Sequence, residues 1–199
     1  MTSERNNDQG LSTADRLLAA ARECVLAVGW KRTTLTDVAH RAGVSRMTVY
    51  RTYPDMATLF ADLMTNESAE LIATVLPDVA ESAGGPERIA TGVAGAVAAV
   101  RRDELFRRAV DLDPEWLLPY LLHRRGRSQD AILDVLVKEI TRAQADGTVR
   151  TGDPETLARG IVLATHGYAI SVGTMTDDRV TTDALDQELI ELVRRYLAP

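Results

Sequence analysis

The segment from Lys31 to Leu59, KRTTLTDVAHRAGVSRMTVYRTYPDMATL, constrains the fold more than any other part of this 199-residue chain. It reads as two short helices joined by a turn at Gly43, a residue that lets the backbone reverse direction. Val44 can fill the crevice between the two helices, and Ala39 is small enough for a close crossing. The spacing therefore predicts a helix-turn-helix, in which the second helix can enter the major groove of DNA.

The second of these helices is predicted to begin after Ser45, which can cap it, and to extend from Arg46 to about Thr52. Val49 packs inward, so its neighbours face outward. Arginine can bind guanine through two hydrogen bonds, and threonine can contact a polar base edge or a thymine methyl. The preceding short helix is predicted to begin at Thr36 as its N-cap.

Charge is distributed unevenly along the chain. Residues 1–60 carry eight Lys/Arg and six Asp/Glu, a balance of +2, whereas residues 61–199 have a balance of −8. Within residues 31–51 a single acid, Asp37, accompanies five basic residues, namely Lys31, Arg32, Arg41, Arg46 and Arg51. A basic island on an acidic body favours a module that contacts phosphates, and the alternative is a chance fluctuation on a solvated surface.

Composition and periodicity favour an all-α fold. Only 5% of residues are aromatic, and apolar residues recur at spacings of three and four, which is typical of amphipathic helices. We expect a disordered arm over 1–12, a helix-turn-helix domain over 13–62 and a helical ligand-binding and dimerisation domain over 63–199. Beyond the helix-turn-helix pair, predicted helices cover 13–28, 55–75, 86–101, 103–110, 114–124, 128–146, 154–174 and 182–197, with an extended piece at 148–151.

Several function classes have little support in the sequence. One cysteine, Cys24, excludes a disulfide framework and a cysteine-cluster metal site, and the three histidines lack metal-ligand spacing. We found no glycine-rich phosphate loop, no catalytic triad pattern, no apolar membrane span and no signal-peptide core. We therefore expect a cytoplasmic protein that is not an enzyme and needs no metal or cofactor.

The segment resembles the DNA-binding domain of the tetracycline-repressor (TetR) family of bacterial regulators over residues 13–62. The resemblance runs through Thr33-Thr34, Val38-Ala39, Ala42-Gly43-Val44-Ser45, Thr48, Tyr50, Tyr53 and Leu59. It implies phosphate contacts from Thr34, Tyr50 and Tyr53, with Arg46, Met47 and Thr48 facing bases. The complete set of expected DNA contacts is Thr33, Thr34, Thr36, Ser45, Arg46, Met47, Thr48, Tyr50, Arg51 and Tyr53.

Two methionines depart from the pattern of the family. Met47 stands where a glycine or another small residue is common, and Met56 stands where a lysine is usual. Met47 can contact thymine methyls or block a close approach to DNA. The loss of a lysine at Met56 removes one phosphate contact, for which Arg51 or backbone N–H groups can compensate.

The last two predicted helices favour a dimer. Gly160, Ala164, Gly167 and Ser171 share one helix face, and small residues allow a second helix to approach closely. The resemblance implies that these helices form a four-helix bundle across a two-fold axis, and the alternative is a helix pair buried within one chain. The expected interface residues are Gly160, Ala164, Gly167, Ser171, Leu185, Leu189, Val193 and Tyr196.

Helices between residues 86 and 146 are expected to enclose a pocket for a small-molecule effector, lined by Phe106, Trp116, Tyr120 and His166. The overall expectation is a homodimeric regulator, a repressor, that binds palindromic operator DNA and is released by an effector. Two alternatives remain: an architectural DNA binder without a ligand, and a helical enzyme or carrier with a vestigial DNA module.

Overall fold

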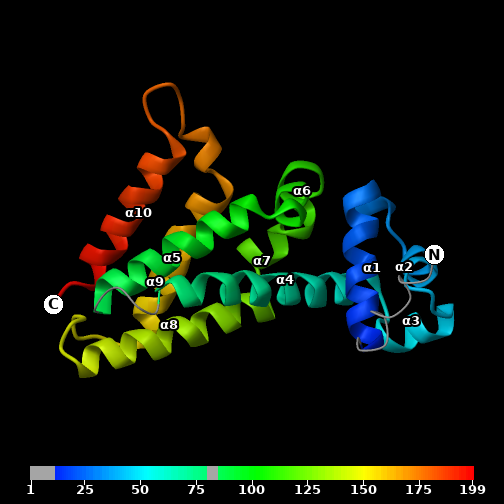
Figure 1. The fold of residues 1–199 in the computed structure, drawn as a ribbon, viewed down its shortest axis with the longest axis horizontal. Coiled ribbons are helices and arrows are strands. Elements are labelled where there is room, and N and C mark those ends of the chain that lie inside the picture. The colour runs from blue at the N-terminus through cyan, green and yellow to red at the C-terminus, as the bar shows by residue number, and fades with distance from the viewer. Residues whose placement is uncertain (1–11, 80–84) are drawn as a thin grey trace, which may run out of the picture.

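A computed structural model of the chain describes residues 12–79 and 85–199, and all regular secondary structure within these residues is helical (Figure 1). The predicted arm over 1–12 lies outside this description except for Ser12. The α-helices are α1 (Thr13–Val28), α2 (Leu35–Arg41), α3 (Arg46–Thr52), α4 (Met56–Val79), α5 (Gly85–Arg102), α6 (Glu104–Leu112), α7 (Leu118–Leu122), α8 (Arg127–Ala145), α9 (Pro154–Ile170) and α10 (Thr182–Leu197). Short 3-10 turns occupy Trp30–Arg32, Pro114–Trp116 and Val172–Thr174.

The start of α2 corrects the predicted N-cap. The cap is Thr34, whose hydroxyl accepts a hydrogen bond from the backbone N–H of Asp37, while the Asp37 carboxylate accepts from the Thr34 N–H at 2.9 Å. This reciprocal pair satisfies two N–H groups at the helix start, which Thr36 as cap would leave unpaired. Hydrogen bonds from Thr34 also lower the pKa of Asp37.

Three other predicted boundaries differ from the structure. Helix α4 continues through Pro77 to Val79, past its predicted end at residue 75, although Pro77 has no backbone N–H to donate within the helix. The predicted helix over 114–124 is a 3-10 turn followed by the short helix α7. The predicted helix over 154–174 ends at Ile170, with Ser171 as its C-cap, and the segment 148–151 is non-helical as predicted.

Two hydrophobic clusters organise the described residues. The first joins α1, α2, α3 and the start of α4 around Trp30 and Phe60, and it also takes in Leu105 and Ala109 of α6. The second is built from α5, α8, α9 and α10. Figure 1 shows α1, α2 and α3 at one end of the molecule and α10 near the other, with the long α4 between them. Helix α6 therefore belongs to the core beside the helix-turn-helix although it follows α5 in sequence.

Candidate DNA-binding surface and internal cavity

Helix α3 is held at its start by Ser45. The Ser45 side chain accepts a hydrogen bond from the Thr48 N–H at 3.1 Å, and the two hydroxyls lie 2.8 Å apart. Val49 is fully buried and anchors the inner face of α3 to the first cluster. The hydroxyls of Ser45 and Thr48 thus fix the helix start while the outer face stays free.

The outer face of α3 carries the exposed side chains Arg46, Met47, Tyr50 and Arg51. Met47 is 78% exposed and Tyr50 is 51% exposed, unusual values for large apolar side chains. Arg46 and Arg51 form no ion pair within the described residues, so both guanidinium groups are free to bind phosphates or bases. These four side chains give α3 the chemistry of a recognition helix.

The structure places two predicted DNA contacts in the protein interior. Thr33 is buried, and its hydroxyl donates to the carbonyl of Gly29 at 2.8 Å. Tyr53 is only 2% exposed, and burial raises the pKa of its hydroxyl. In this structure both side chains therefore pack inside the DNA-binding domain. Thr36 is half-buried, and Thr34 is exposed as the cap of α2.

The turn of the helix-turn-helix is tied to α1. Gly43 has a positive φ of 65°, which favours glycine, and the N–H of Val44 donates to the carbonyl of Ala39 at 3.0 Å. Arg16 of α1 donates to the carbonyl of Ala42 at 2.7 Å. The orientation of α3 therefore depends on the position of α1.

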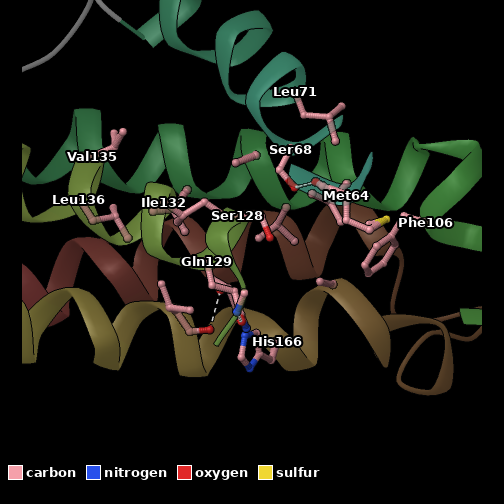
Figure 2. A pocket seen from close by; sticks show the side chains of 18 of the residues that line it. Met64, Ser68, Leu71, Phe106, Ser128, Gln129, Ile132, Val135, Leu136 and His166 are labelled. Carbon is pink, nitrogen blue, oxygen red and sulfur yellow. Dashed lines mark hydrogen bonds between the residues drawn. The ribbon is translucent and has the colours of Figure 1, made fainter. Parts of the chain in front are cut away.

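A cavity of about 450 Å³ lies between α4, α5, α6, α7, α8 and α9 (Figure 2). Its wall is mostly apolar and includes three of the four predicted ligand contacts, Phe106, Tyr120 and His166. Trp116 lies outside this wall, where it packs against Phe60 at a centroid distance of 5.5 Å and against Trp30 at 6.0 Å. A cavity of this size falls within the range of small-molecule sites.

One side of the cavity wall connects directly to the DNA-binding module. Glu67 of α4 and Asp103, the N-cap of α6, both line the cavity. The guanidinium of Arg22 on α1 donates to Glu67 at 3.2 Å and lies 4.0 Å from Asp103. Glu67 is buried, and desolvation raises its pKa although Arg22 opposes the shift.

The other end of α6 also contacts the helix-turn-helix module. Asp113, the buried C-cap of α6, accepts a hydrogen bond from the backbone N–H of Trp30 at 3.0 Å. Lys31 forms an exposed ion pair with Glu115 just beyond it, at 2.7 Å. Helix α6 is therefore attached to the DNA-binding module at both of its ends.

The structure divides the predicted interface residues between interior and surface. Leu189 and Val193 are fully buried against the second cluster, so a partner chain has no access to their side chains. Gly160 is covered by Tyr196, whose hydroxyl would lie 2.6 Å from a Cβ at that position. The space that Gly160 leaves is therefore filled by Tyr196 of the same chain.

The surface of α9 and α10 nevertheless carries apolar groups. Ala164, Gly167 and Ser171 are exposed, and Leu185 is half-buried. Leu163 is 70% exposed and Leu192 is 45% exposed, and sequence reasoning missed both. A Cβ at Gly167 would meet no atom within 4 Å, so another backbone has room to approach there.

Within the described residues, no group of three or more His, Cys, Asp or Glu side chains is arranged to hold a metal ion. None of the helices in this part of the chain is long and apolar enough to cross a membrane.

Comparison with known proteins identifies the class. Residues 17–63 match the family described as bacterial regulatory proteins, tetR family. An uncharacterized HTH-type transcriptional regulator of Mycobacterium bovis is 33% identical over 192 residues, which cover 96% of this chain and 97% of the relative. The chain therefore belongs to the TetR family of DNA-binding transcriptional regulators, as the sequence predicted.

Solved structures share the fold at lower identity. The transcriptional repressor QsdR of R. erythropolis has a TM-score of 0.70 at 16% identity, covering 93% of this chain and 94% of its own. FadR of Bacillus subtilis, solved in complex with stearoyl-CoA, has a TM-score of 0.63 at 17% identity, covering 92% and 98%. Both confirm the all-helical architecture.

The residues that link the cavity to α1 were missed from sequence. Arg22, Glu67, Asp103 and Asp113 lie on three separate elements, α1, α4 and the two ends of α6, and nothing in their local spacing marks them as partners. The only available signal was the polar character of Arg22 and Glu67 on otherwise amphipathic helices, which is also typical of solvated residues.

Proposed function

We propose that this TetR-family regulator is a homodimeric repressor that binds a palindromic operator through α3 and releases it when a small molecule fills the cavity. The observation that carries this proposal is that Glu67 and Asp103 line the cavity and also contact Arg22 of the DNA-binding module. A ligand that displaces either carboxylate changes the support of α1. Because α1 holds the turn before α3 through Arg16, the change reaches the recognition helix.

The dimer part of the proposal uses the exposed surface of α9 and α10. Leu163, Ala164 and Gly167 on α9, its C-cap Ser171 and Leu192 on α10 present apolar and small groups to solvent. A two-fold axis beside this surface would bury them against their own copies. Two α3 helices about 34 Å apart would then enter successive major grooves of a palindrome.

Two structural neighbours support a regulatory function. QsdR is a transcriptional repressor, and FadR of Bacillus subtilis was solved in complex with stearoyl-CoA. We carry over from them only the general roles of repression and small-molecule binding. The chain is therefore proposed to act by binding rather than by catalysis.

The DNA-binding role is tested by reversing the two free charges of α3. The double variant Arg46→Glu, Arg51→Glu is expected to weaken binding to a selected duplex at least about 30-fold, because each good arginine contact is worth about 1–3 kcal/mol. Fluorescence anisotropy at about 150 mM salt measures the affinity. Lys138→Glu with Arg179→Glu is the matched control, since it makes the same change in net charge at exposed sites of the C-terminal domain.

Unchanged affinity for DNA in the α3 variant, or an equal loss of affinity in the control, would exclude α3 as the recognition helix. The release mechanism is tested separately, by measuring whether a compound that binds the cavity lowers the affinity for the same duplex.

A further inference from the structure

The polar groups in the cavity wall are mostly paired already. Thr65, Ser68 and Thr165 donate their hydroxyl hydrogens to carbonyls of their own helices, at 2.6, 2.7 and 2.8 Å. The Gln129 amide accepts from the Gly126 N–H at 2.8 Å and donates to the Tyr120 carbonyl at 3.2 Å. These side chains already form hydrogen bonds within the protein, so they offer little to a ligand.

The charged groups of the wall are also largely satisfied. Glu67 is paired with Arg22, Asp103 accepts from the Phe106 N–H at 2.7 Å, and Arg88 pairs with Glu139. The other two arginines of the wall, Arg127 and Arg142, are exposed, and Arg127 pairs with Asp62. Arg142 forms no ion pair within the described residues, but it is exposed to solvent. An ionised ligand inside this cavity would therefore lose its hydration and gain at most a counter-ion that solvent screens, which is costly.

His166 differs from these groups. It lines the cavity from α9 (Figure 2), is half-buried, and forms no hydrogen bond within the described residues. Burial lowers the pKa of its imidazole, so the ring is neutral and presents one N–H donor and one nitrogen acceptor. Ser128 also lacks a partner there, but it lies in the first turn of α8 beside the exposed Arg127.

We infer that the cavity takes an uncharged, largely apolar molecule with one carbonyl or hydroxyl group, and that His166 binds this group. The inference rests on the proposed effector role of the cavity. The apolar wall binds the body of the molecule through the hydrophobic effect. His166 then discriminates such a compound from an alkane that lacks the polar group.

The experiment measures direct binding of three compounds to the purified full-length protein, by displacement of the uncharged dye Nile red. The compounds are 2-decanone, decane and the decanoate anion, all at pH 7.5. We expect 2-decanone to bind about fivefold more tightly than decane, the effect of one hydrogen bond, and more tightly than decanoate.

Variants locate the hydrogen bond. His166→Leu is expected to abolish the preference for 2-decanone over decane, whereas His166→Gln, which retains a donor and an acceptor, is expected to preserve it. Thr165→Val is the matched control, since its hydroxyl bonds within α9, and it should leave the preference unchanged. A retained preference in His166→Leu, a loss in Ser128→Ala instead, or tighter binding of decanoate would overturn the inference.

Binding and DNA release are scored separately. If 2-decanone binds through His166 but leaves the affinity for DNA unchanged, the effector role fails while the ligand class stands. If none of the three compounds displaces the dye, the ligand class is overturned, although a different compound that releases DNA would still support the proposed function.

Discussion

Replacement of Arg22 by methionine is expected to destabilise the protein more at high pH than at low pH. Methionine retains an unbranched apolar stem but removes the guanidinium that pairs with Glu67 and faces Asp103. The two carboxylates then lie near each other at the cavity wall without a cation between them. Hydrogen bonds to charged groups contribute about 1.5–3 kcal/mol. Because the Arg22 side chain is 37% exposed, solvent screens part of this interaction with the carboxylates. We therefore expect the free energy of unfolding to fall by about 1–2 kcal/mol at pH 8.

The pH dependence follows from the pKa of Glu67. Its folded pKa already lies above the value of 4.5 for an unperturbed glutamate, because burial outweighs the attraction of Arg22. The stability gained from protonating Glu67 is fully present below the pKa that Glu67 has in the unfolded chain. It is lost as the pH rises through the pKa that Glu67 has in the folded protein. Removing Arg22 raises the folded pKa further. The variant therefore loses more stability than the wild type as the pH rises, and the difference between them is smallest near pH 5.

Urea unfolding followed by tryptophan fluorescence measures this effect. Both tryptophans of the chain, Trp30 and Trp116, lie in or against the first cluster, so their emission reports on the core beside Arg22. The double variant Arg22→Met, Glu67→Gln is the control, and its loss should not grow with pH. An equal loss of stability for Arg22→Met at pH 5 and pH 8, or no loss at either, would refute the role of this pair.

Two further predictions concern the contact at the C-terminus of α6 and the proposed dimer surface. Asp113→Ala leaves the buried Trp30 N–H without its acceptor and should lower the free energy of unfolding by about 1–3 kcal/mol in urea titrations. Asp113→Asn retains a carbonyl acceptor and should lower the free energy of unfolding clearly less. Similar losses for the two variants would argue against the hydrogen bond. Leu163→Glu should convert the dimer to a monomer at micromolar concentration in sedimentation velocity experiments. Ala131→Glu, on the exposed face of α8, is the control and should leave the dimer intact. A dimer that persists in Leu163→Glu would place the interface elsewhere.

The helix-turn-helix was predictable because its signals are local. The spacing from Ala39 through Gly43 to Ser45 predicts the turn, and the structure confirms it with the positive φ of Gly43 and the cap at Ser45. The cap of α2 was misplaced by two residues because Thr34 and Thr36 are both suitable caps. Only the pairing of Thr34 with Asp37 distinguishes them.

Burial across helices was less predictable. The apolar stripe of α10 was assigned to a partner chain, but Leu189 and Val193 pack within the protomer. Periodicity identifies an apolar face without identifying what covers it. For the same reason Trp116 and Phe106 looked alike in sequence, although only Phe106 lines the cavity. The contacts of Arg22 and Asp113 join residues far apart in the chain, which a single sequence does not reveal.

Selection of bound duplexes from a random DNA pool, with the wild-type protein at about physiological salt, would show whether two copies of α3 recognise one operator. We expect enrichment of a palindrome whose half-sites are centred about one helical turn apart, because two copies of α3 would bind it together. Binding without an enriched sequence, at an affinity that falls steeply as salt rises, would contradict it and would indicate contact with phosphates alone.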